Sequence, residues 1–256
     1  LLEEIEAISR KKGRVTLTKL GRQISRLPVD PRYARMVVAA GEFNALMEVM
    51  VIATGLSIQD PRERPQDKRA QADEAHSEFA DKDSDFIALW NLWVAFREQQ
   101  KALSNSQLRK WCHGHFINYL RMREWQDIVS QLRKSVAEID LRITRQAADY
   151  QAIHQALCSG LLSHVGMKDK DREYLGARNT KFMIFPGSGL AKANPKWIVA
   201  AELVETSKLF GRMVAKIEPQ WLEALGEHLV KRNYAEPHWS KKRGAVAASE
   251  RVTLFG

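Results

Sequence analysis

The segment Leu17–Met36, which reads LTKLGRQISRLPVDPRYARM, restricts the fold of this chain more than any other stretch. Its first half predicts a helix, because Leu20, Ile24 and Leu27 recur at helical spacing with polar residues between them. Thr18 lies just before them, where its side chain can accept a hydrogen bond from an otherwise unpaired backbone N–H. The segment therefore begins with a capped amphipathic helix.

The second half of the segment predicts a corner followed by another helix. Pro28 ends the first helix, because proline has no N–H to donate and disfavours helical geometry at the residue before it. Asp30 is a suitable cap for the next helix, and Pro31 suits its first position. The sequence LPVDP thus sets two helices at a fixed corner.

The same string resembles the junction between the winged-helix and ratchet (HA2) domains of DEAH-box ATP-dependent RNA helicases of the bacterial HrpA type. WCHGHFINYLRMREWQDIVSQL is similar to the WCxxxFINYxxL…QL segment of that ratchet domain, and DFIALWNLWVAF is similar to the helix before it. FPGSGL and PKWIVAAELVETSKLFGRMVAKIEPQWL are similar to the OB-fold region of the family. The resemblance extends, in order, over nearly all 256 residues.

The chain departs from the family pattern at a few positions. Leu120 stands where many relatives have Arg, and the FPGS sequence that begins at Phe185 replaces the more usual HPSS. Ala200 and Ala201 occupy a segment that is often aromatic, and Phe210 with the glycine after it replaces Tyr-Met. These differences concern individual RNA contacts rather than membership of the family.

Periodicity and resemblance together predict a multidomain α + β chain, in which a mostly helical bundle is followed by a small antiparallel β-barrel. Residues 1–30 would form the C-terminal part of a winged-helix domain, with a helix and a short strand before the capped helix. Residues 31–145 would form the helical, ratchet-like (HA2) domain. Residues 146–256 would contribute one helix and an OB-fold domain, because their short segments are rich in β-branched and aromatic residues. An SH3-like barrel would satisfy the same strand pattern.

Several finer expectations follow from local patterns. The stretch SIQDPRERPQDKRA predicts a solvent-facing loop. Asp83 or Ser84 is the expected cap of the helix DFIALWNLWVAFREQ, whose aromatic residues are expected in the core. Near the end of the chain, EPQWLEALGEHLVKR predicts an inserted helix and AVAASERVTLF predicts a last strand.

Charge and cysteine content indicate a cytoplasmic protein with a polyanionic partner. The net charge is +9, and residues 161–256 contribute 16 Lys+Arg against 10 Asp+Glu, or +6. Cys112 and Cys158 are too few for a disulfide framework, which favours a reducing compartment. The longest apolar run, Val49–Leu56, is far shorter than the ~20 residues of a membrane span, so no membrane contact is expected. The absence of an initiator Met favours a piece of a longer protein.

The sequence lacks the motifs of an ATPase motor. It has no GxxxxGK[ST] phosphate loop, no DEAH motif and no arginine-finger block. No catalytic residue, metal or cofactor is therefore expected in this chain, whereas the resemblance implies ATP and Mg²⁺ for the parent helicase. We expect the chain alone neither to hydrolyse ATP nor to unwind RNA.

Three short patterns suggest other chemistry but have simpler explanations. The CHGH cluster at 112–115 places its ligands too close together for a structural zinc site, and no second pair follows. Asp81, Asp83 and Asp85 resemble part of a calcium loop that lacks its glycine and distal Glu, so helix capping is the better interpretation. Ser188 lies in PGSGL, which is not the GxSxG motif of a nucleophile.

Candidate RNA contacts fall in two regions. On one long helix, basic residues alternate with Tyr119 and Trp125, a face that can contact phosphates and stack a base. A solvated basic face with buried aromatic residues fits this pattern equally well. In the OB-like region, basic and amide side chains flank the strands, where OB folds bind single strands, although isolated surface lysines are also common. The candidates are Tyr119, Arg121, Arg123, Arg178, Asn179, Lys181, Ser188, Lys192 and Lys196. The run Lys241-Lys242-Arg243 is more typical of a solvated loop.

The resemblance implies an accessory region that grips single-stranded RNA against the motor domains of the same polypeptide, in a helicase that moves 3′ to 5′. The alternative is a protein-interaction module at which an activator protein docks, with little RNA contact of its own.

Overall fold

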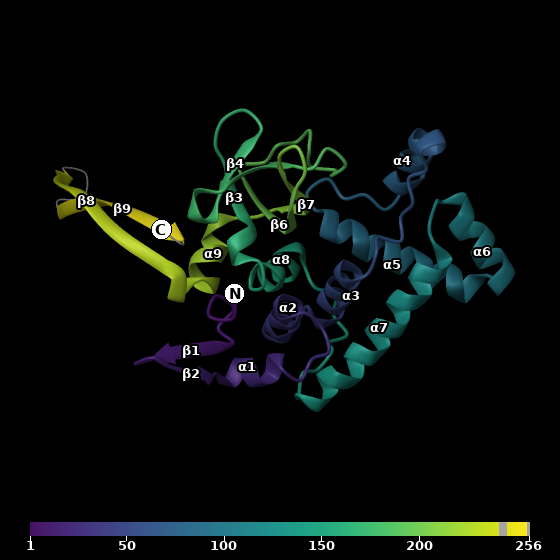
Figure 1. Ribbon diagram of the computed structural model, residues 1–256, viewed down its shortest axis with the longest axis horizontal. Helices are drawn as coiled ribbons and strands as arrows, with labels where there is room; N and C mark the ends of the chain where they lie inside the picture. Colours follow the sequence, from purple (N-terminus) through teal and green to yellow (C-terminus); the bar gives the residue numbers. More distant parts are fainter. Residues whose placement is uncertain (241–244, 255–256) are drawn as a thin grey trace.

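The computed structural model describes residues 1–240 and 245–254, and it joins a helical part to a closed β-barrel (Figure 1). The predicted α + β architecture is therefore confirmed. In Figure 1 the helices between residues 85 and 138 extend to one end of the molecule, and the paired strands at residues 230–240 and 245–254 project at the other.

The first residues do not form the expected helix. Residues 1–7 are turns, and strands β1 (Ile8–Lys11) and β2 (Arg14–Leu17) form an antiparallel hairpin. The two-residue turn requires left-handed backbone at both central positions, and Lys12 (φ 48°) and Gly13 (φ 78°) adopt it. Ile5, one of the apolar residues that suggested a helix, is buried, but the chain around it forms turns instead.

The corner after β2 forms as the sequence predicts. Helix α1 (Lys19–Ile24) begins after Thr18, whose hydroxyl oxygen accepts the N–H of Gly21 at 2.8 Å. A side chain at Gly21 would collide with a backbone carbonyl, so this close approach requires glycine. Helix α2 (Pro31–Glu42) begins after Asp30, which accepts the N–H of Arg32 at 2.9 Å.

The rest of the helical part follows the predicted order, except that residues 66–70 of the stretch expected to be a loop are helical and include the start of α4. Its helices are α3 (Leu46–Ser57), α4 (Arg69–Ser77), α5 (Asp85–Ala102), α6 (Asn105–Gly114) and α7 (Tyr119–Glu138). Ser84 caps α5, and its hydroxyl oxygen accepts the N–H of Ile87 at 3.2 Å. Phe86, Trp93 and Phe96 of α5 are buried, as expected, whereas Trp90 is only half-buried.

The stretch expected to be a solvent-facing loop is held on one side by the connection between α6 and α7. The N–H of Glu63 donates to the carbonyl of Phe116 at 2.8 Å, and the N–H of Asn118 donates to the carbonyl of Pro61 at 2.8 Å. Phe116 has left-handed backbone (φ 53°), which turns the chain so that this pairing forms. The loop over residues 58–65 is thus held against the helical domain by backbone hydrogen bonds.

After helix α8 (Tyr150–Cys158), five strands close into a barrel. They are β3 (Val165–Lys168), β4 (Glu173–Gly176), β5 (Lys181–Ile184), β6 (Trp197–Glu205) and β7 (Leu209–Lys216). The order around the barrel is β3-β4-β5-β7-β6, and β5 and β7 pair in parallel while the other neighbours are antiparallel. Buried side chains such as Tyr174, Phe182 and Val214 fill its interior.

The end of the chain differs from the expectation in two ways. Helix α9 (Pro219–Leu225) is shorter than predicted, and Val230–Ser240 forms a strand, β8, that sequence reasoning assigned partly to that helix. The expected last strand, β9 (Ala245–Leu254), pairs with β8 in a separate hairpin instead of joining the barrel, which closes without it. The basic run at 241–243 lies outside the described residues.

Besides one cluster in the helical part and one in the barrel, the described residues contain a large core that joins all three predicted regions. It contains Ile5 from the first turns, Val37 from α2, Leu157 from α8, Val199 from β6 and Leu222 from α9. Because the three regions share this core, packing alone marks no separation at residues 30 and 145, and those boundaries stay predictions.

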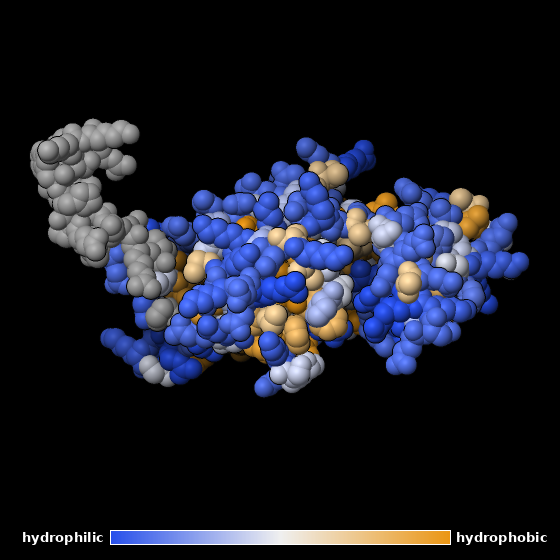
Figure 2. All heavy atoms as spheres, turned by 90° about the horizontal axis from the view of Figure 1, so that it is seen from above, coloured by the Kyte–Doolittle hydropathy of each residue, from blue (hydrophilic) through white to orange (hydrophobic). Residues whose placement is uncertain are grey.

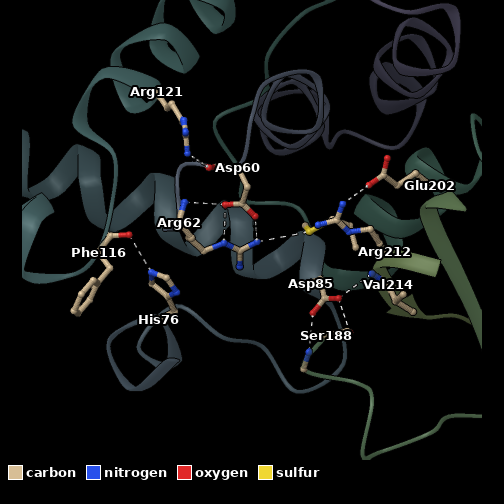
Figure 3. A network of polar contacts seen from close by, with 12 residues as sticks. Asp60, Arg62, His76, Asp85, Phe116, Arg121, Ser188, Glu202, Arg212 and Val214 are labelled. Carbon is tan, nitrogen blue, oxygen red and sulfur yellow. Dashed lines mark hydrogen bonds and ion pairs between the residues drawn. The ribbon is translucent and has the colours of Figure 1, made fainter. Parts of the chain in front are cut away.

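A buried carboxylate joins the helical part to the barrel. Asp85, the first residue of α5, is only 9% exposed. Its Oδ2 accepts the hydroxyl of Ser188 at 2.6 Å and the N–H of Val214 at 2.9 Å, and its Oδ1 accepts the N–H of Gly189 at 3.1 Å (Figure 3). All three donors belong to the barrel region. Sequence reasoning treated Asp85 only as part of a helix cap, so this role corrects it.

A second polar contact between the two parts surrounds Tyr150 of α8. Its hydroxyl lies 2.9 Å from the carbonyl oxygen of Asp83 and 2.8 Å from that of Lys216 at the end of β7. The N–H of Lys216 also donates to the carbonyl of Asp83 at 2.9 Å. This contact ties the residues just before α5 to the barrel next to the Asp85 site.

Buried His154 belongs to the same joint. Its Nδ1 lies 2.6 Å from the carbonyl oxygen of Tyr150, and its Nε2 lies 2.7 Å from the hydroxyl of Ser84. A carbonyl oxygen can only accept, so we assign the proton to Nδ1, and Nε2 then accepts from Ser84. Burial lowers the pKa of His154 to about 4, which keeps the ring neutral in this arrangement.

We predict that Asp85→Asn lowers the free energy of unfolding by about 2–4 kcal/mol, measured by urea denaturation. The amide keeps one acceptor oxygen and places an NH₂ group among N–H and O–H donors, so at least one buried donor loses its partner. The control is Asp127→Asn on the exposed face of α7, which should change stability little. Equal effects of the two substitutions would contradict the role of Asp85.

We also predict that stability falls as the pH falls from about 6.5 to about 4. The unfolded chain binds a proton at the ordinary histidine pKa of 6.5, whereas the folded chain resists it until about 4. This shift of about 2.5 units corresponds to roughly 3 kcal/mol, present above pH 6.5 and lost toward pH 4. His154→Gln removes this contribution. Above pH 6.5 the variant should therefore have a lower free energy of unfolding than the natural chain, and this difference should shrink as the pH falls. A difference that is constant with pH would contradict the assignment.

Candidate nucleic-acid interface

The nine predicted RNA contacts do not come together in one site. Tyr119, Arg121 and Arg123 lie at the start of α7, whereas the other six lie in the barrel region. In Figure 1 the start of α7 lies beside α6 at one end of the molecule, well away from β3 and β4. The nine residues therefore form two separate groups.

On α7 the predicted face divides between the core and the surface. Trp125 is fully buried, and its ring N–H donates to the carbonyl of Val51 at 2.9 Å, so it cannot stack a base. Tyr119 is half-buried, with the guanidinium of Arg109 5.1 Å from the centre of its ring. Arg123 is exposed. Of the two interpretations of this helix face, the solvated basic face with buried aromatic residues therefore holds for Trp125.

Arg121 is engaged within the protein. Its Nη1 donates to the carbonyl of Asp60 at 3.0 Å (Figure 3). The same nitrogen lies 3.8 Å from a carboxylate oxygen of Glu63. These contacts fasten α7 to the loop over residues 58–65. A role for Arg121 in RNA binding would require it to share or leave these partners.

The same loop is anchored to the barrel through Arg62. Arg62 binds the carboxylate of Asp60 with two nitrogens, at 2.7 and 3.0 Å, and its Nη2 lies 3.6 Å from the sulfur of Met213 in β7. Burial alone would raise the pKa of Asp60, but the charge and hydrogen bonds of Arg62 lower it below its ordinary value. Figure 3 shows this pair between α7 and the barrel. Arg62 thus serves the joint between the two parts.

In the barrel, Lys181 is already paired with acids. Its ammonium lies 3.0 Å from the carboxylate of Asp169 and 3.6 Å from that of Glu173. The hydrogen bond and charge of Asp169, followed by the charge of Glu173, raise the pKa of Lys181. Arg178 and Asn179 form the left-handed turn between β4 and β5, with φ of 54° and 59°, and both are exposed.

Ser188 is explained by a contact within the chain. Its hydroxyl donates to Asp85 at 2.6 Å, and its oxygen accepts the N–H of Leu190 at 3.1 Å. The hydroxyl thus already donates one hydrogen bond and accepts another, so Ser188 is not available to a ligand. Its proposed RNA contact stays a prediction that the geometry does not favour.

Lys192 and Lys196 are exposed, and a third lysine joins them. The loop that carries them is fastened to β3, because the N–H of Lys168 donates to the carbonyl of Lys196 at 2.8 Å. The hydroxyl of Tyr174 also lies 3.0 Å from the side-chain oxygen of Asn194 in this loop. Within the described part of the chain, no ion pair holds any of the three lysines, and the ammonium of Lys168 lies 3.4 Å from the carbonyl oxygen of Asn194. We call Lys168, Lys192 and Lys196 the basic loop surface.

Sequence reasoning missed Lys168, because its neighbours in GMKDKDREY alternate in charge and gave no basic stretch. The exposed side chains of Lys170 and Arg172 lie in the adjoining turn between β3 and β4. Figure 2 views the molecule from the side on which this turn projects in Figure 1, and hydrophilic residues cover most of that face.

A second feature of the barrel is an aromatic cluster on its outer surface. The rings of Phe185 and Phe210 meet edge to face with their centres 6.0 Å apart. The guanidinium carbon of Arg212 lies 5.1 Å from the centre of the Phe185 ring, and Arg212 also lies 3.5 Å from a carboxylate oxygen of Glu202. Both rings are only half-buried. Sequence reasoning noted the two phenylalanines only as departures from a family pattern.

The described residues offer neither a metal site nor a membrane-spanning helix. Within them, no three His, Cys, Asp or Glu side chains are grouped so that they could hold a metal ion. Cys112 is buried in the helical core, which raises the pKa of its thiol to about 11. Among the same residues, no helix has the length and apolar character needed to cross a membrane.

Comparison with protein families identifies both parts of the fold. Residues 30–89 match the helicase associated domain (HA2), described as ratchet-like, and residues 153–229 match the oligonucleotide/oligosaccharide-binding (OB)-fold. The barrel is therefore of the OB type, which decides between the two barrels that the strand pattern allowed.

Comparison with individual proteins covers the whole chain. It is 56% identical over 261 residues to an ATP-dependent RNA helicase HrpA homolog of Haemophilus influenzae, and 55% identical over 259 residues to ATP-dependent RNA helicase HrpA of Escherichia coli. Each match includes 100% of this chain and 20% of the relative, so the chain spans about a fifth of their length. The chain therefore belongs to the HrpA helicase family, and it represents the part that carries the HA2 and OB-fold domains.

Proposed function

We propose that this chain is the accessory region of an ATP-dependent RNA helicase and that it grips single-stranded RNA against the motor domains of the longer polypeptide. The observation that carries the proposal is the basic loop surface, in which three exposed lysines lie on an OB-type barrel, one at the end of β3 and two in the loop fastened to it. In this proposal ATP and Mg²⁺ bind to the motor domains, and the chain alone has no ATPase activity.

The placement of the basic loop surface suits phosphate binding. OB folds bind oligonucleotides with the face of their second and third strands and with adjacent loops, including the loop between the first two strands. Lys168 precedes that loop here, and Lys192 and Lys196 lie in the segment fastened to it. Lysines contact the phosphate backbone rather than base edges, so this grip would not depend on sequence.

The joint between the two parts supports a mechanical role. A strand held on the barrel can be moved by the helical domain only if the barrel cannot pivot freely. Asp85 and Tyr150 fasten the start of α5 to β7 and to the turn that begins at Phe185. RNA gripped by the barrel would therefore move together with the helical domain.

One observation favours the alternative function, docking of an activator protein. The side chain of Leu120, at the start of α7, is 75% exposed. A leucine this exposed beside half-buried Tyr119 offers an apolar contact to a protein rather than to a phosphate. This surface lies on the helical part, away from the basic loop surface, so the two functions can be tested separately.

We predict that the triple variant Lys168→Glu, Lys192→Glu, Lys196→Glu weakens binding of single-stranded RNA at least tenfold at low salt. Replacing three cations removes about three phosphate contacts, so the slope of log affinity against log salt should become shallower by about 2. Fluorescence anisotropy with a labelled single-stranded RNA, titrated at several salt concentrations, measures both quantities.

The matched control makes the same change of charge elsewhere. Lys19, Lys101 and Lys134 are exposed residues of α1, α5 and α7, and the triple change of these to Glu should affect binding much less. Equal loss in both triple variants would mean that RNA senses only the net charge. Absence of any binding by the natural chain, even at low salt, would refute the proposed function.

A further inference from the structure

We propose that Phe185, Phe210 and Arg212 form a platform on which a base of the bound single strand stacks. The platform rests on the proposed function, because it adds base contacts to the phosphate grip, and it lies at a different place on the barrel. The three side chains are brought together by β5 and β7, which are parallel neighbours.

Strand geometry directs these side chains outward. Phe210 and Arg212 are two residues apart on β7, so they share one face, and Gly211 between them is buried against Phe182. Phe185 follows β5 directly, and its N–H donates to the carbonyl of Gly211 at 3.0 Å. The barrel thus presents two half-buried rings and a guanidinium side by side on its outer surface.

The guanidinium is arranged for stacking. It lies over the Phe185 ring at 5.1 Å, and Glu202 on the neighbouring strand lies 3.5 Å from one of its nitrogens. About half of the Arg212 side chain is exposed, at 49%. A planar guanidinium held on an aromatic ring is a surface on which a base can stack, and such stacking does not depend on which base is present.

The surroundings favour a nucleic acid over a protein partner. Lys208 lies 3.9 Å from the sulfur of Met183, which is paired with Phe210 across the strands, so a second cation borders the apolar surface. Lys208 belongs to the loop between β6 and β7, which joins the fourth and fifth strands of the barrel. That loop is one that OB folds use for oligonucleotides. Cations that border exposed rings are typical of single-strand binding surfaces.

The platform is fixed before any ligand arrives. Asp85 accepts the N–H of Val214, two residues after Arg212, and it also accepts the groups of Ser188 and Gly189 that follow Phe185. One carboxylate therefore holds both segments that carry the platform. Met213 adopts left-handed backbone (φ 52°) between Arg212 and Val214, which marks the point where the strand turns toward Asp85. A fixed platform loses little freedom on binding, which favours affinity.

The test compares RNA with and without bases. The probes are a labelled oligouridine of about 12 nucleotides and an abasic ribose-phosphate strand of the same length. Phe210→Leu keeps an apolar side chain but removes the ring, and we expect about tenfold weaker binding of oligouridine with unchanged binding of the abasic strand. Phe43→Leu, at a half-buried position after α2, is the matched control and should change neither.

A second variant guards against misfolding. Arg212→Lys keeps the charge and loses the planar group, so it should also weaken binding of oligouridine while sparing the abasic strand. Thermal unfolding checks that each variant folds as the natural chain does.

The outcomes separate the platform from the proposed function. If the natural chain binds both strands and the Phe210 and Arg212 variants match it, the platform is refuted and the phosphate grip stands. If the variants lose affinity equally for both strands, the residues act on the fold and not on bases, which also refutes the platform. If the natural chain binds neither strand, the proposed function fails and the platform fails with it.

Discussion

The structure depends on one buried carboxylate, that of Asp85, which accepts its hydrogen bonds from the barrel. A charged group that is 9% exposed is stable only when hydrogen bonds within the protein replace those it would make to water. For Asp85 the barrel supplies three donors, which belong to Ser188, Gly189 and Val214. Those donors come from two separate segments, so the barrel fits against α5 in one orientation. The Asp60–Arg62 pair and the Tyr150 hydroxyl add polar contacts across the same joint. The helical domain and the barrel therefore form one mechanical unit, as the proposed grip on single-stranded RNA requires.

Some basic side chains of this chain are held by partners within the protein, and others are available to a ligand. Arg62, Arg121 and Lys181 contact acidic residues or carbonyls nearby, and their charges stabilise the fold. Lys168, at the end of β3, and Lys192, in the loop fastened to it, remain exposed, and no ion pair among the described residues holds either of them. A net charge of +9 thus says little about where a polyanion binds until the internal partners are known. In the proposed function, phosphates bind the basic loop surface and a base stacks on the platform of Phe185, Phe210 and Arg212, so both contacts lie on one barrel.

Local signals predicted the parts of the fold that local physics determines. Thr18 and Asp30 cap their helices as their positions indicated, and the buried face of α5 follows from its spacing. Interactions between distant residues could not be predicted in this way. The donor Val214 is 129 residues from Asp85, and the acids that pair with Lys181 became its neighbours only when β3, β4 and β5 closed. The first turns and β8 were misassigned because short apolar stretches suit helices, turns and strands alike.

The rigid joint at Asp85 is the central claim, and residual dipolar couplings test it most directly. Couplings of backbone amides in α2–α7 and in β3–β7 would be measured for the same aligned sample. If the two parts move as one body, a single alignment tensor fits both sets of couplings in this relative orientation. Two tensors that differ in magnitude or direction would show that the barrel pivots against the helical domain, and this would contradict the account.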